Sequence, residues 1–134
     1  MSVLKDKSFK FALRIVNIST SLIEKKEYVL SKQLLRSGTS IGANIREAQN
    51  AQSKSDFIHK LSISQKECDE TMYWLELLNQ SDFISEAEFK PIYSEANELL
   101  KMLRSSIITA KKNNNVGEES PIYNNELINN TYLL

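Results

Sequence analysis

Apolar residues recur with helical spacing in four segments of the chain, and a few polar residues separate each segment from the next. The segments cover residues 7–26, 29–52, 55–79 and 86–112. In the last segment an apolar residue returns every three or four positions: Phe89, Ile92, Ala96, Leu99, Leu103, Ile107 and Ala110. Because this spacing places apolar side chains on one side of a helix, the pattern predicts four amphipathic helices.

Two helix starts carry capping signals. Ser85 precedes Glu88 by three residues, which is the spacing of a capping box, and Ser53 precedes Asp56 in the same way. The connections between the segments are short, so successive helices are expected to run antiparallel. The sequence therefore predicts an all-α fold, an antiparallel up-down-up-down four-helix bundle formed by one domain, residues 1–112.

The second segment contains two glycines, Gly38 and Gly42, each of which weakens a helix by about 1 kcal/mol relative to alanine. One interpretation is a broken helix with a turn at residues 37–39. A continuous helix is favoured, because the apolar spacing stays in phase from Leu34 to Ile45. The glycines then share one face with other small residues, where a second backbone can approach closely.

The first segment has two apolar lines instead of one. One line consists of Phe11, Ile15, Ile18 and Leu22, and the other of Phe9, Leu13, Val16 and Ile23. Together they form a stripe that is broader than one neighbouring helix needs. Such a stripe suits a subunit of an oligomer.

The C-terminal segment, residues 113–134, differs in composition from the rest. Seven of its 22 residues are Asn, and no helical stripe is present. We expect this Asn-rich segment to be flexible, or to be ordered only by a partner.

The charged residues are balanced overall but distributed unevenly. Residues 1–60 have 11 Lys or Arg and 5 Asp or Glu, a net charge of +6, whereas residues 61–134 have 6 and 12, a net charge of −6. Such an asymmetry indicates either a nucleic-acid surface on the basic half or an attraction between the halves, within one subunit or between subunits. The second interpretation is favoured, because no stretch is a dense run of cations.

We expect no signal for secretion or membrane insertion, because residues 1–7 lack an apolar signal-peptide core. Its one cysteine excludes an internal disulfide, and a reducing compartment is the natural environment for such a chain. No apolar run approaches the roughly 20 residues that span a bilayer. We therefore expect a cytoplasmic protein without membrane contact.

The sequence lacks the residue sets of common enzyme sites. It has no glycine-rich phosphate-binding motif, and its single histidine, His59, cannot supply the two Glu-x-x-His pairs of a di-iron bundle. Cys68 lies on an apolar line and is expected to be buried and inert. We therefore predict no catalytic residues, no metal, no cofactor and no small-molecule substrate, and a binding or assembly role instead of an enzyme.

A polar ridge runs along the second segment. It consists of residues spaced by four, four and three positions: Arg36, Ser40, Asn44 and Glu47. A solvated helix face is the commonest form of such a ridge. The functional interpretation is a contact line that sets the register of an interface, with Lys32 and Arg46 beside it as potential phosphate contacts.

The run of residues 34–48 resembles the signature of the four helix bundle protein family, also called the S23 ribosomal protein or 23S rRNA intervening-sequence protein family. Most of the match lies in the Ser-Ile-x-x-Asn-Ile-x-Glu-Ala core, from Ser40 to Ala48, and the third segment also fits. The resemblance covers roughly residues 6–112. It implies an antiparallel four-helix bundle that assembles as a homopentamer, without known catalytic residues.

The family is also similar to the accessory variability protein of diversity-generating retroelements, a basic pentamer that binds nucleic acid. This chain departs from that pattern, because its net charge is zero. Two hypotheses follow: a homo-oligomer that binds RNA or an RNA–protein partner, and a protein-only adaptor. The candidate interface or partner-binding residues are Arg36, Ser40, Asn44, Arg46 and Glu47. The candidate nucleic-acid contacts are Lys5, Lys7, Lys10, Arg14 and Lys32.

Overall fold

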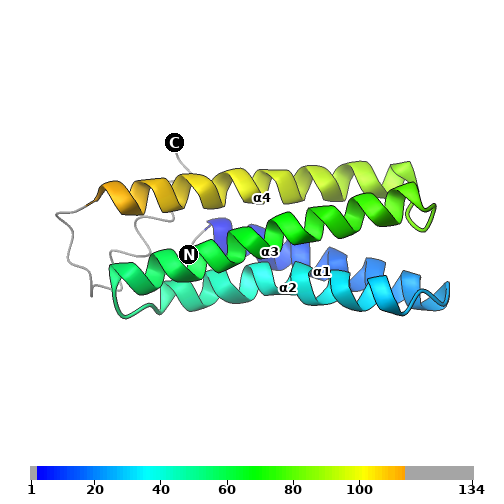
Figure 1. Ribbon diagram of the computed structural model, residues 1–134, viewed down its shortest axis with the longest axis horizontal. Helices are drawn as coiled ribbons and strands as arrows, with labels where there is room; N and C mark the ends of the chain where they lie inside the picture. The colour runs from blue at the N-terminus through cyan, green and yellow to red at the C-terminus, as the bar shows by residue number, and fades with distance from the viewer. Residues whose placement is uncertain (1–2, 114–134) are drawn as a thin grey trace.

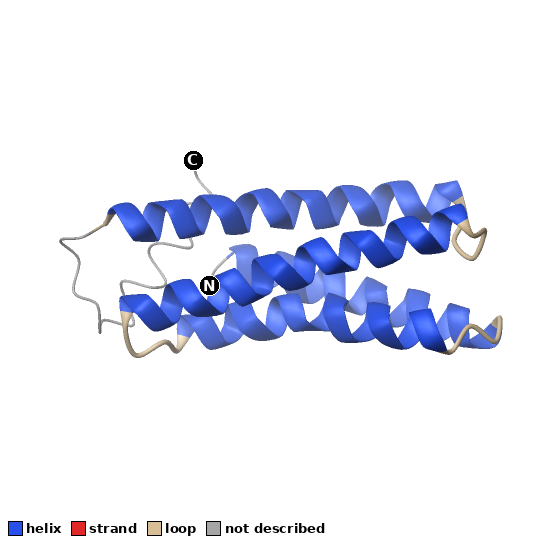
Figure 2. Cartoon of the chain, in the orientation of Figure 1, coloured by secondary structure: helices blue, strands red, loops and turns tan. Residues whose placement is uncertain are grey.

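Four helices form the part of the chain that the computed structural model describes, residues 3–113 (Figure 1). They are α1 (Val3–Glu24), α2 (Val29–Gln49), α3 (Lys54–Gln80) and α4 (Glu86–Lys112). Each helix packs against the next one along the chain, and α4 packs against α1. The arrangement is the predicted antiparallel four-helix bundle, with helices joined by short loops (Figure 2).

The helices begin close to the predicted positions, with one clear difference. The first helix starts at Val3, four residues before the predicted start, because Leu4 is buried in the core and fixes the first turn. Both predicted caps are present. The Ser53 hydroxyl accepts a hydrogen bond from the Asp56 backbone N–H, and Ser85 and Glu88 form a reciprocal capping box.

The helix α2 runs without interruption through both glycines, so the alternative of a turn at residues 37–39 is wrong. The glycines bring α1 and α2 close together. A Cβ atom on Gly38 would lie 2.8 Å from Cγ2 of Ile15, and a Cβ atom on Gly42 would lie 3.2 Å from Oγ of Ser8. The absence of a side chain at Gly38 therefore leaves the space that Ile15 fills.

One hydrophobic core runs along the bundle, and its largest members are Phe11 and Phe57. Buried hydroxyl groups link α2 to α3 within this core. The Thr71 hydroxyl donates to Oγ of Ser37 at 2.9 Å, and the Ser64 hydroxyl donates to the Ile41 carbonyl at 2.8 Å. These bonds satisfy the hydroxyl groups that donate them, whereas Oγ of Ser106 on α4 is buried without a hydrogen-bond partner in the described part of the chain.

Among residues 3–113, no helix combines the length and apolarity that crossing a membrane requires. The Asn-rich segment predicted to be flexible lies outside the described residues, except for Asn113.

Candidate functional site

The outer side of α1 carries a line of exposed apolar side chains. Its members are Phe9, Leu13, Val16 and Ile23, with exposed fractions of 53%, 52%, 42% and 50%. These four residues, named here the α1 apolar face, are the second apolar line of the first segment. The first line is turned into the core, where Phe11, Ile15 and Leu22 are buried and Ile18 is half-buried.

A mainly apolar groove adjoins this face at the junction of α1 and α2. It has a volume of about 440 Å³ and is lined by Lys5, Ser8, Phe9, Ala12, Thr39, Gly42, Ala43, Arg46 and Glu47. Its lining includes the small α2 residues Gly42 and Ala43 together with Phe9 of α1, so the predicted small-residue face and the α1 apolar face meet there. Of the candidate partner-binding residues, Arg46 and Glu47 are part of this groove.

Arg36, the first residue of the polar ridge, is engaged within the subunit. Its guanidinium forms ion pairs with Glu67 and Glu70 of α3, with a distance of 3.2 Å to Oε1 of Glu67. The Trp74 indole N–H also donates to Oε1 of Glu70. These partners were not predicted from the sequence, although the three-residue spacing of Glu67 and Glu70 places them on one side of α3.

The rest of the ridge also makes local contacts. The Ser40 hydroxyl donates to the Arg36 carbonyl at 2.6 Å, and the Asn44 amide donates to the Ser40 carbonyl at 2.8 Å. Glu47 forms an ion pair with Lys60 of α3 at 3.1 Å. These contacts link the ridge to its own helix and to α3, while Arg46 is exposed.

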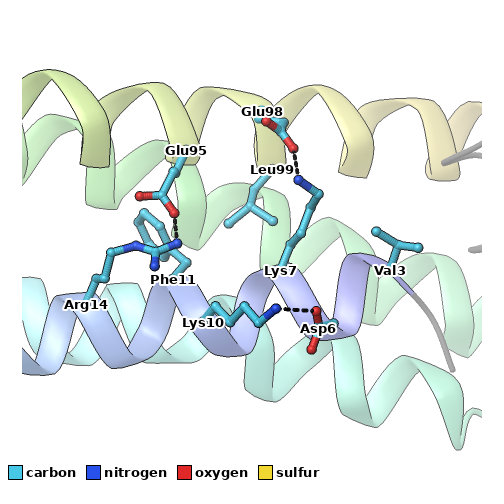
Figure 3. Close-up of a pocket in the computed structure, with 9 residues that line it drawn as sticks. All are labelled: Val3, Asp6, Lys7, Lys10, Phe11, Arg14, Glu95, Glu98 and Leu99. Carbon is cyan, nitrogen blue, oxygen red and sulfur yellow. Dashed lines mark ion pairs between the residues drawn. The ribbon is translucent and has the colours of Figure 1, made fainter.

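Two of the candidate nucleic-acid contacts bridge α1 to α4. Lys7 pairs with Glu98 at 2.5 Å, and Arg14 pairs with Glu95 (Figure 3). The contact between α1 and α4 is the least extensive of the four helix contacts described above. Cations of the basic half thus meet carboxylates of the acidic half within one subunit, which is the interpretation favoured from the charge distribution.

The other three candidate contacts are not gathered on a single surface. Lys10 pairs with Asp6 on the same helix at 3.1 Å, as Figure 3 shows. Lys5 is half-buried at the groove between α1 and α2, and Lys32 is exposed on α2.

Cys68 lies in the core, as predicted. Its thiol donates to the Ala96 carbonyl of α4 at 3.2 Å. Burial, together with the nearby Asp69 carboxylate, raises the pKa of Cys68 from 9.0 to about 12. Because the thiolate is the reactive form, this thiol is poorly suited to act as a nucleophile.

The raised pKa of Cys68 predicts a loss of stability in alkali. The folded state holds the thiol proton more tightly than the unfolded state, so the stabilisation is complete below pH 9 and is lost as pH rises towards about 12. In urea unfolding, the free energy of unfolding of the wild type should therefore fall more steeply above pH 9 than that of Cys68→Ala, so that the difference between the two proteins narrows. Parallel pH profiles would contradict this assignment.

Within residues 3–113, no group of three or more His, Cys, Asp or Glu side chains is arranged to hold a metal ion. His59 is exposed on α3.

Comparisons with known proteins agree with this architecture. The family model described as 23S rRNA-intervening sequence protein matches residues 2–105. The chain is also similar to a crystal structure from Bacteroides thetaiotaomicron, a protein with unknown function from the S23 ribosomal protein family, with a TM-score of 0.77. The sequences are 56% identical, and the match covers 78% of this chain and 98% of the other. No protein with a curated description matches the sequence.

Proposed function

Because this chain belongs to the 23S rRNA-intervening sequence protein family, we propose that it is a non-enzymatic cytoplasmic protein that assembles into a homo-oligomer of five bundles and binds RNA or an RNA–protein partner. The observation that carries the assembly is the α1 apolar face. From Phe9 to Ile23 it extends over about 21 Å of helix. Exposed apolar patches of this kind mark interaction sites, since water disfavours them.

A ring of five subunits requires two different patches that fit each other, because its contacts run head to tail. The α1 apolar face provides one patch. A second patch is available on α3, where Tyr73 and Leu77 are 55% and 38% exposed. These two residues are four positions apart and therefore lie on the same side of the helix. We place them opposite the α1 apolar face of the next subunit.

The alternative is a protein-only adaptor. It is favoured by the ion pairs of Lys7, Lys10 and Arg14, because a cation that is paired with a carboxylate attracts a phosphate less strongly. RNA binding and assembly are therefore tested separately.

Light scattering tests the assembly. The wild type should have a mass about five times the 15.4 kDa of one chain. Leu13→Glu should reduce this mass, because it places a charge in the middle of the α1 apolar face, where burial is costly. Val29→Glu is the matched control, since Val29 is 70% exposed at the start of α2, and it should keep the wild-type mass. A monomeric wild type, or an unchanged Leu13→Glu, would contradict the proposed interface.

Light scattering in the presence of a structured RNA fragment tests the proposed RNA binding. An assembly that gains RNA mass at low salt and loses it at moderate salt would support phosphate binding. An assembly of unchanged mass would leave the adaptor as the better function.

A further inference from the structure

The cations of α4 are concentrated in its second half. Residues 86–98 contain four carboxylates and one lysine, whereas residues 99–112 contain four cations and no carboxylate. These four cations are exposed: Lys101, Arg104, Lys111 and Lys112. The most acidic part of the sequence therefore contains a strongly basic helical surface.

Helical spacing places these cations on one side of α4. From Lys101 to Arg104, Ile108 and Lys111, the steps are three or four residues, and the stretch from Lys101 to Lys112 is about 16 Å long. Lys66 of α3 extends the surface. It lines a shallow groove between α3 and α4 together with Ser62, Gln65, Asp69, Leu100 and Arg104. We name Lys66, Lys101, Arg104, Lys111 and Lys112 the basic face.

The cations of the basic face form no ion pair within residues 3–113. In the described part of the chain, every ion pair engages a cation from the first 60 residues, namely Lys7, Lys10, Arg14, Arg36 and Lys60. Asp69 shares the groove with Lys66 and Arg104 and forms no ion pair with either of them. The fold therefore pairs several cations of the basic half with carboxylates and leaves these later cations in solvent.

The helix dipole accounts for only part of the basic face. Cations in the last turn stabilise the C-terminal end of a helix, and Lys111 and Lys112 are in that position. The effect is confined to the last turn, whereas Arg104 lies eight residues before the end of α4 and Lys101 lies eleven residues before it. The helix dipole therefore does not explain the positions of Lys101 and Arg104.

We propose that the basic face is the surface that binds the phosphate backbone of structured RNA, an assignment that rests on the RNA-binding part of the proposed function. Five cations on two adjacent helices match a polyanion, because Lys and Arg contacts to phosphate supply most of the sequence-independent affinity. The only exposed large apolar side chain among residues 99–112 is Ile108, so the surface lacks the apolar centre of a protein interface. It also lacks the aromatic side chains on which unpaired bases stack.

The basic face is compatible with assembly through α1. The groove next to the α1 apolar face lies between α1 and α2, whereas the basic face lies over α3 and α4. In a bundle whose neighbouring pairs are α1–α2, α2–α3, α3–α4 and α4–α1, these are opposite sides. The second patch of the proposed interface, Tyr73 and Leu77, lies on α3 about 10 and 16 Å beyond Lys66. That end of α3 is beside the first half of α4, where Tyr93 donates to Glu76, whereas Leu100 and Arg104 are beside Ser62 and Lys66. The assembly therefore leaves the cations of α4 outside the proposed contact and repeats them once per subunit.

Fluorescence anisotropy with a labelled RNA hairpin tests the assignment on the full-length protein. The variant Lys101→Gln with Arg104→Gln should bind about tenfold or more weakly at low salt, and the slope of log K against log salt should fall by about 1 for each phosphate contact removed. Arg104→Lys should bind nearly as well as the wild type, because it keeps the charge. Both positions are exposed, so helicity by circular dichroism and mass by light scattering should not change.

Two variants serve as controls. Lys90→Gln removes an exposed cation from the acidic half of the same helix and should leave binding unchanged. Lys32→Gln with Arg46→Gln removes two exposed cations of α2 that the sequence predicted as potential phosphate contacts. If this α2 variant loses affinity for the hairpin while the α4 variant keeps it, the protein binds RNA, but the assignment of the binding surface to the basic face is wrong. If the wild type itself does not bind the hairpin at low salt, the proposed RNA function fails and the basic face fails with it.

Discussion

Replacing Phe11 with alanine is expected to lower the free energy of unfolding by about 3–5 kcal/mol. Phe11 is completely buried in the core, so its removal loses the transfer free energy of the ring and leaves a cavity between helices. Chemical denaturation followed by circular dichroism at 222 nm would measure the change.

Val29→Ala is the control for this experiment. Val29 is 70% exposed, and its truncation should change the free energy of unfolding by less than about 0.5 kcal/mol. Phe9→Ala adds an informative comparison, because Phe9 lies two residues from Phe11 on the opposite, exposed side of α1. If Phe11→Ala destabilised the protein as little as Val29→Ala, the placement of Phe11 in the core would be contradicted.

The second large effect is expected at Gly38. Gly38→Leu should destabilise the protein by about 3 kcal/mol, because overpacking a close helix contact forces backbone shifts. Even the first added carbon would lie 2.8 Å from Cγ2 and 2.9 Å from Cγ1 of Ile15, a buried and β-branched side chain. This cost exceeds the gain of about 1 kcal/mol that helix propensity offers when glycine is replaced.

A double-mutant cycle tests whether the loss of stability at Gly38 arises from contact with Ile15. Gly38→Ala and Ile15→Ala should each destabilise the protein, and the double variant should be less destabilised than the sum by at least about 0.5 kcal/mol, because truncating Ile15 makes room for the new Cβ atom. Lys32→Leu, at an exposed position of the same helix outside the groove between α1 and α2, controls for the added leucine. Strict additivity in the cycle would show that Gly38 and Ile15 do not share a contact.

The contrast between α1 and α4 bears on how charge should be interpreted in this family. The basic first half of the sequence suggested a surface for nucleic acid, and its residues Lys7 and Arg14 are instead bound to Glu98 and Glu95. Those pairs lie at the seam between α1 and α4, where the helices have their least extensive contact. Charges that are remote in sequence thus join the first and last helices, and their potential to attract a polyanion is reduced.

The sequence by itself determined the four helices, their order and their caps, since these depend on local spacing and on side chains three residues apart. It also marked the α1 apolar face, because a stripe too wide for one neighbour is visible in the order of Phe9, Leu13 and Val16. The continuity of α2 through Gly38 could likewise be predicted from the phase of its apolar residues, although glycine propensity opposed it.

Only the tertiary structure decided which cations form ion pairs and which remain in solvent. Arg36 and Glu70 are 34 residues apart and Arg14 and Glu95 are 81 residues apart, and no local pattern states that they meet. The pairing depends on how each helix rotates about its axis when the core forms, which brings Arg36 to α3 and leaves Lys101 and Arg104 in solvent. The helical period predicts the face of a helix on which a residue lies, whereas packing of the whole bundle determines what that face meets.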